Sequence, residues 1–170
     1  MAANFADQVT PHHPQARAAA VWLVAEHGAR HPRAAAILAH MAANFADQVT
    51  PHHPQARAAA VWLVAEHGAR HPRAAAILAH MAANFADQDE LVKLQLLSLA
   101  VKLSVTQPDT IPVCRYVVSL ARYDVSYDVR DRARMLRRFI EPQPGKVLHN
   151  YVADIFLPEK PKPDIQSSFK

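Results

Sequence analysis

Glycine and cysteine are both scarce in this 170-residue chain, which contains three glycines and one cysteine. The shortage of glycine argues against a β-sandwich or barrel, because such folds depend on frequent glycine turns. The single cysteine, Cys114, excludes a disulfide within the chain and favours a reducing compartment. No apolar run approaches the roughly 20 residues of a membrane-spanning helix, and the N-terminus lacks the pattern of a signal peptide. We therefore expect a soluble cytoplasmic protein.

Lysine is absent from the first 90 residues, whereas ten of the eleven histidines lie within the first 80. The formal net charge is only +4, which permits binding to nucleic acid or to an anionic membrane without requiring either. Thirteen prolines accompany a chain that is 51% hydrophobic. This composition favours packed helices that are separated by proline breaks.

An exact internal repeat dominates the first half of the chain. Residues 1–40 recur unchanged as residues 41–80, and the octapeptide MAANFADQ begins a third time at Met81. A period near 40 residues is typical of HEAT-type helix pairs. Complete identity indicates a recent or engineered duplication, or an artefact of gene assembly, because function alone does not preserve every surface position. We expect residues 14–47 and 54–87 to superpose as equivalent helix pairs.

Each repeat is predicted to contain two helices. In the first copy, one helix runs from Pro14 to Gly28 and is apolar on almost every side, so we expect neighbours on both sides. The second begins near Pro32 and is predicted to end near Gln48, which makes the octapeptide the end of a helix. The apolar face of the second helix comprises Ala34, Ile37, Leu38, Met41 and Phe45.

The remaining sequence keeps the rhythm of helices and breaks. Asp89 is predicted to cap a helix that extends to about Val105, and Thr110 to cap the next one after the break TQPD. The inward residues of these two helices are expected to be Val92, Leu96, Leu99 and Leu103, followed by Val113, Val117 and Leu120.

Two further helices follow the turn YDVSYD. Asp128 is predicted to cap the first of them, and the second is predicted to run from Lys146 to about Leu157. Their inward residues are expected to be Val129, Ala133, Leu136 and Ile140, followed by Leu148, Tyr151, Val152 and Ile155.

The predicted fold is all-α. It is a superhelical α-solenoid of about four HEAT- or armadillo-like helix pairs over residues 1–157. Residues 158–170 are polar and rich in proline, which predicts a tail or linker.

No residue pattern predicts catalysis, a cofactor or a bound metal. His27 and His31 are four residues apart, but Gly28 and Pro32 interrupt the helix that would place them on one face. Cys114 has no histidine nearby in sequence, and the isolated glycines form no phosphate-binding loop. We therefore expect no enzyme activity.

A cluster of arginines follows the turn YDVSYD. On a helix, one side would contain Arg130, Arg134, Arg137 and Arg138, while Arg132 would point elsewhere. These four residues are candidates for contact with a partner or an anion. The favoured alternative is structural, in which Asp128 caps, Asp131 occupies the first turn, and the arginines pair with carboxylates of adjacent helices.

Several stretches resemble the C-terminal part of β-adaptin trunks. They are PQARAAAVWLVAEH, DELVKLQLLSLAVKL, YDVSYDVRDRARMLRRFI and YVADIFLPEKPKPDIQSSFK, and together they cover residues 41–170. The VRDRA core is shared with a coatomer subunit, whereas the double Tyr-Asp and the terminal pattern narrow the resemblance to β-adaptins of adaptor protein complex 3. Where the family often has glycine, this chain has Ala25.

The resemblance implies a scaffold in a heterotetrameric vesicle coat adaptor that sorts cargo from Golgi or endosomes toward lysosome-related organelles. It implies a medium chain, a second large chain and a small chain as partners, with peripheral association to the membrane. It implies neither nucleic-acid binding nor, in the absence of an acidic leucine motif, clathrin binding. The alternatives are a generic HEAT-type or coatomer-like scaffold and a basic solenoid that binds lipid or RNA.

Overall fold

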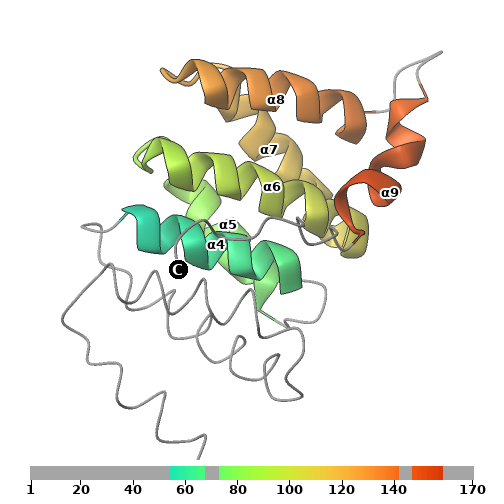
Figure 1. Ribbon diagram of the computed structural model, residues 1–170, viewed down its shortest axis with the longest axis horizontal. Coiled ribbons are helices and arrows are strands. Elements are labelled where there is room, and N and C mark those ends of the chain that lie inside the picture. Colours follow the sequence, from blue (N-terminus) through green and yellow to red (C-terminus); the bar gives the residue numbers. More distant parts are fainter. Residues whose placement is uncertain (1–53, 68–72, 142–146, 159–170) are drawn as a thin grey trace, which may run out of the picture.

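The computed structural model describes residues 54–67, 73–141 and 147–158, and these residues are helical with no strand among them (Figure 1). Predictions on the first copy of the repeat, including its histidines and its superposition on the second copy, lie outside these residues. Two short 3-10 turns are Pro108–Thr110 and Leu148–Tyr151. The α-helices are α4 (Pro54–His67), α5 (Ala74–Ala83), α6 (Glu90–Thr106), α7 (Ile111–Ala121), α8 (Tyr127–Ile140) and α9 (Val152–Phe156).

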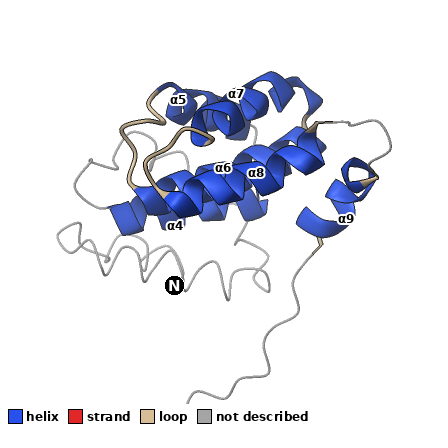
Figure 2. Cartoon of the chain, turned by 90° about the horizontal axis from the view of Figure 1, so that it is seen from above, coloured by secondary structure: helices blue, strands red, loops and turns tan. Residues whose placement is uncertain are grey.

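The helices form two layers. Helices α4, α6 and α8 lie side by side in one layer, and α5 and α7 lie in the other (Figures 1 and 2). Successive helices thus form the pairs α4–α5, α6–α7 and α8–α9, which confirms the predicted all-α solenoid of stacked helix pairs. Lys102 on α6 forms an ion pair with Glu66 on α4, which links neighbouring helices of the first layer.

Helix α4 confirms the predicted first helix of the repeat. It begins at Pro54, whose fixed φ suits the first turn of a helix. Val61 and Val64 are 2% and 4% exposed and belong to the main core, while Leu63 is 2% exposed without joining that core cluster. The helix is therefore buried on more than one side, as its uniformly apolar sequence predicted.

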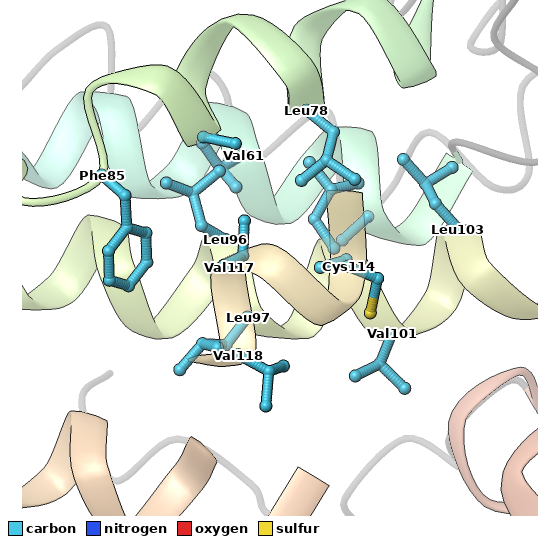
Figure 3. Packing of buried hydrophobic residues seen from close by; sticks show 14 of the residues in the cluster. Val61, Leu78, Phe85, Leu96, Leu97, Val101, Leu103, Cys114, Val117 and Val118 are labelled. Carbon is cyan, nitrogen blue, oxygen red and sulfur yellow. The ribbon is translucent and has the colours of Figure 1, made fainter. Parts of the chain in front are cut away.

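Helix α6 lies at the centre of the core. Its predicted inward residues are fully or almost fully buried, and Leu97 and Val101 are buried beside them (Figure 3). Each leucine that is removed from water in this way stabilises the fold by about 1.5–3 kcal/mol. Because α6 contacts α4, α5, α7 and α8, its burial links both layers.

The octapeptide is only partly helical. Helix α5 ends at Ala83, and Asn84 is its C-cap, so the predicted continuation to the position equivalent to Gln48 is wrong. The Phe85 N–H donates to Ala82 O at 3.2 Å, and the Gln88 N–H donates to Phe85 O at 3.2 Å. These turns stop the helix and bring Phe85, which is 2% exposed, into the core.

The helix caps agree with the sequence only in part. Asp89 caps α6 as predicted, because its carboxylate accepts from the Leu91 N–H at 3.0 Å. Asp128 does not cap α8; Ser126 does, with its hydroxyl accepting from the Val129 N–H at 3.4 Å. Thr110 precedes α7, but its hydroxyl donates to Gln107 O at 2.8 Å in a 3-10 turn and does not cap the helix.

Two predicted inward faces also need correction. Leu120 on α7 is 37% exposed, because the buried face of this helix passes through Cys114, Val117 and Val118. The last helix is shorter than predicted, and a 3-10 turn precedes it. Because three residues per turn replace 3.6, the apolar face shifts from the predicted one. Val152 and Phe156 contact the core, whereas Leu148, Tyr151 and Ile155 are exposed.

Candidate interaction surface at the α7–α8 turn

The turn between α7 and α8 exposes three large apolar side chains. Tyr123 is 81% exposed, Val125 is 91% exposed, and Tyr127 is 78% exposed, the highest values for large apolar residues in the described ranges. Asp124 and Ser126, which alternate with them, are partly buried and hydrogen-bonded. We call Tyr123, Val125 and Tyr127 the apolar tip.

Asp124 anchors the turn to α6. Its Oδ2 lies 2.7 Å from the Nζ of Lys93, and the two side chains are only 8% and 11% exposed. Its Oδ1 accepts from the Ser126 N–H at 2.9 Å. Burial by itself raises the pKa of the Asp124 carboxyl, but the bonds from Lys93 and Ser126, with the charges of Lys93 and Arg130, hold that pKa below its ordinary value.

Lys93 joins this turn to the octapeptide. Its ammonium lies 5.8 Å from the centre of the Phe85 ring, as well as beside Asp124. A buried ammonium needs such partners, since an unpaired charge away from water is costly. One cation on α6 therefore stabilises two turns from different helix pairs.

Arg130 completes the support of the tip. Its Nη1 donates to the backbone carbonyls of Asp124 and Val125, the latter at 2.9 Å. Its guanidinium lies 4.3 Å from the centre of the Tyr127 ring. The arginine thus fixes the backbone of the turn and covers one face of an exposed tyrosine.

The other candidate arginines also lie on α8. Arg134 pairs with Asp131 at 2.7 Å, and the Arg137 Nε donates to Glu141 at 2.6 Å. Both carboxylates lie within four residues of their arginine, so the expected pairing with adjacent helices is wrong for these two residues. Arg138 is exposed at the end of the helix.

Sequence reasoning found the arginines but did not identify the tip or its anchor. The available signal was the alternation in Tyr123-Asp124-Val125-Ser126-Tyr127, where polar residues separate apolar ones between two helices. The partner of Asp124 could not be found in this way, because Lys93 lies on another helix pair.

Other reactive groups have structural roles. Cys114 is buried, and burial raises the pKa of its thiol to about 11. Within the described ranges, no three or more His, Cys, Asp or Glu side chains gather as they would around a metal ion. The helices that the structure describes also include none long and apolar enough to cross a membrane.

The stacked helix pairs define a helical-repeat scaffold, and comparison with known proteins identifies its class. Residues 32–144 match the family described as the adaptin N terminal region, and the chain belongs to this family. The chain is 45% identical over 84 residues to mouse AP-3 complex subunit beta-2, and 43% identical over the same length to human AP-3 complex subunit beta-1. Each match covers 48% of this chain and 8% of the relative. The resemblance inferred from sequence is confirmed.

Proposed function

We propose that this chain is a scaffold segment of a β-type large subunit in a vesicle coat adaptor complex, acting in intracellular protein transport. The observation that carries this proposal is the adaptin match over residues 32–144, which coincides with stacked helix pairs. Helical-repeat stacks present extended surfaces on which other proteins assemble. The chain acts by holding partners in place rather than by catalysis.

The proposed partners are a medium chain, a second large chain and a small chain. In this assembly the chain lies peripherally on Golgi or endosomal vesicles and contributes to sorting toward lysosome-related organelles. The printed names of the relatives support this assignment, because they are subunits of an adaptor complex. The proposed domain division remains residues 1–157 as trunk and residues 158–170 as tail.

Helix α7 offers a surface for a protein partner. Tyr116 is 52% exposed and Leu120 is 37% exposed, and their spacing of four residues places them on one face of the helix. Helix α7 belongs to the α5–α7 layer, so this face is separate from the α4–α6–α8 layer (Figure 2). Exposed tyrosine and leucine on a rigid helix are typical of the apolar centre of a protein interface.

The proposal is tested by co-expressing the tagged full chain with adaptor medium, small and second large chains, and separately with coatomer subunits. We expect adaptor subunits to co-purify. The double substitution Tyr116→Ser with Leu120→Ser should lower recovery of the bound subunit about tenfold, which corresponds to a loss of about 1.4 kcal/mol. Met135→Ser is the matched control, because Met135 is an exposed apolar residue on α8.

Two results would overturn the proposal. Recovery of coatomer subunits without adaptor subunits would favour the coatomer-like scaffold. Recovery of no subunit, with the chain folded by circular dichroism, would favour a generic helical scaffold outside vesicle coats.

A further inference from the structure

We propose that the apolar tip and the arginines of α8 form a contact site for an anionic membrane surface. The tip comprises Tyr123, Val125 and Tyr127. The basic face comprises Arg130, Arg134 and Arg138, which recur along one side of α8. This inference goes beyond the proposed function, because it assigns a lipid contact to this chain itself, whichever proteins the chain holds.

The shape and composition of the tip suit a lipid interface. Its three side chains project from a turn and are 78–91% exposed, so they can enter a soft apolar layer without a preformed pocket. Tyrosine is enriched where a membrane meets water, since its ring is apolar and its hydroxyl is polar. Val125 lies between the two tyrosines in sequence and is the most exposed of the three.

Backbone groups of the turn are already paired, which lowers the cost of removing them from water. Arg130 donates to the carbonyls of Asp124 and Val125. The Tyr123 N–H donates to Leu120 O at 3.0 Å, and the Ser126 N–H donates to the Asp124 carboxylate at 2.9 Å. An unpaired backbone group in a lipid environment would cost several kcal/mol.

Positive charge surrounds the tip. Arg122 lies 5.6 Å from the centre of the Tyr123 ring, and Arg130 lies 4.3 Å from the centre of the Tyr127 ring. Both cations therefore lie beside the tyrosine rings. Arg138 follows Tyr127 by 11 residues on the same side of α8, a distance of about 16 Å at 1.5 Å per residue. The basic face is long enough to contact several lipid headgroups.

Nearby carboxylates offset only part of this charge. Residues 115–141 contain seven arginines against four acidic residues. Asp124 is buried against Lys93, and Asp131 and Glu141 each pair with an arginine of α8. Asp128 is exposed, but its position in the helix turns it away from the basic face. The exposed surface therefore keeps a positive excess.

A lipid surface explains the tip better than RNA or a folded protein does. Arg122 and Arg130 already cover one face of each tyrosine ring, which limits base stacking, and Val125 has no use in binding RNA. A folded partner would need a pocket shaped to a protruding tip. An anionic bilayer needs no such shape, and it attracts clustered arginines near its surface.

The first test measures insertion of the tip with a fluorophore. Val125→Cys in the full chain is labelled with an environment-sensitive dye, and labelling is selective because Cys114 is buried with a thiol pKa of about 11. With vesicles of 70% phosphatidylcholine and 30% phosphatidylserine, we expect a blue shift and quenching by brominated lipid. Met135→Cys is the control and should show neither effect. Equal responses at the two positions, or no response at position 125, would overturn the proposal.

The second test measures binding by co-sedimentation with the same vesicles. Val125→Asp, and separately Arg134→Glu with Arg138→Glu, should each reduce binding about tenfold or more, since adjacent charges each contribute about 1 kcal/mol at an anionic surface. Arg132→Glu is the matched control, since Arg132 is exposed on α8 away from the basic face. Circular dichroism verifies the fold of each variant.

Binding that requires phosphatidylserine and weakens with added salt supports the proposal. Three outcomes would overturn it: equal binding to vesicles of phosphatidylcholine alone, an equal loss with Arg132→Glu, or binding to a single-stranded RNA but not to vesicles. These outcomes are independent of the recovery of adaptor subunits, so this inference and the proposed function can fail separately.

Discussion

Lys93 on α6 and Asp124 in the α7–α8 turn form a buried ion pair with 2.7 Å between Nζ and Oδ2. The two residues are 31 positions apart in sequence, and they join the pair α6–α7 to the start of α8. The carboxylate also binds the Ser126 N–H, so the ion pair and the conformation of the turn depend on each other. The exposed tip is therefore held by a buried interaction.

Breaking this pair should strongly destabilise the chain. Asp124→Ala leaves the ammonium of Lys93 buried without its carboxylate, and we expect the free energy of unfolding to fall by about 3–5 kcal/mol. Asp131→Ala is the control, because the Asp131–Arg134 pair is 70% and 65% exposed and contributes about 0–1 kcal/mol. Urea unfolding followed by circular dichroism measures both variants. A similar loss for the two variants would contradict the assigned role of the buried pair.

The same pair should make stability depend on pH in the acid range. Because the pKa of Asp124 is lowered in the folded chain, its contribution is present above the unfolded value of about 4 and is lost as pH falls through the folded pKa. The difference in unfolding free energy between the unsubstituted chain and Asp124→Asn should therefore be largest near neutral pH and shrink below about pH 4. Urea unfolding at several pH values tests this, and a difference that stays constant down to pH 2 would refute it.

The start of α8 should be more sensitive to Ser126 than to Asp128. Ser126→Ala removes the side-chain cap on the Val129 N–H and should cost about 0.5–2 kcal/mol. Asp128→Asn removes only a favourable charge in the first turn, which contributes about 0.3–1 kcal/mol. Thermal unfolding of the two variants compares these effects. A larger loss for Asp128→Asn would favour the cap that was predicted from sequence.

A core leucine and an exposed leucine on α6 should differ sharply. Leu96 is 0% exposed, so Leu96→Ala should cost about 2–5 kcal/mol through lost burial and a residual cavity. Leu91 is 48% exposed at the start of the same helix, and Leu91→Ala should cost well below that range. Urea unfolding of both variants provides the measurement, and equal losses would mean that α6 is packed differently.

Cys114 should resist modification until the chain unfolds. Its burial and its thiol pKa of about 11 leave little thiolate at pH 8, and thiolate is the reactive form. Reaction with a disulfide reagent should be at least about 100-fold slower in the folded chain than in guanidinium chloride. Because the folded pKa is raised, the contribution of this thiol to stability is complete below about pH 8.5 and declines as pH rises toward 11. Rapid labelling of the native chain would contradict this burial.

Parts of the fold were readable because they depend on local patterns. The stripe Val129, Ala133, Leu136 and Ile140 on α8 was predicted correctly, since periodicity along one helix determines which residues share a face. The end of α5 and the cap of α8 were not, because several residues nearby could serve. Phe85 stops the helix by turning into the core, and Ser126 becomes the cap once Asp124 is engaged by Lys93.

The candidate site shows the same division. The position of the arginines on one helix followed from sequence spacing, and their partners did not. Asp131 and Glu141 lie near their arginines along the chain, but Arg130 binds carbonyls whose position depends on the turn. The exposure of Val125 also depends on how two helices meet, which no local pattern records.

The sequence by itself determined the helical class, the repeat, the adaptin relationship and most inward faces, because each follows from periodicity or from resemblance along the chain. Tertiary structure decided which polar residues became buried partners, where α5 ends, and which apolar residues stayed exposed. The physical reason is that Lys93 and Asp124 are costly to bury apart and favourable to bury together. Their meeting depends on the stacking of helix pairs, and it is this meeting that holds Tyr123, Val125 and Tyr127 at the surface.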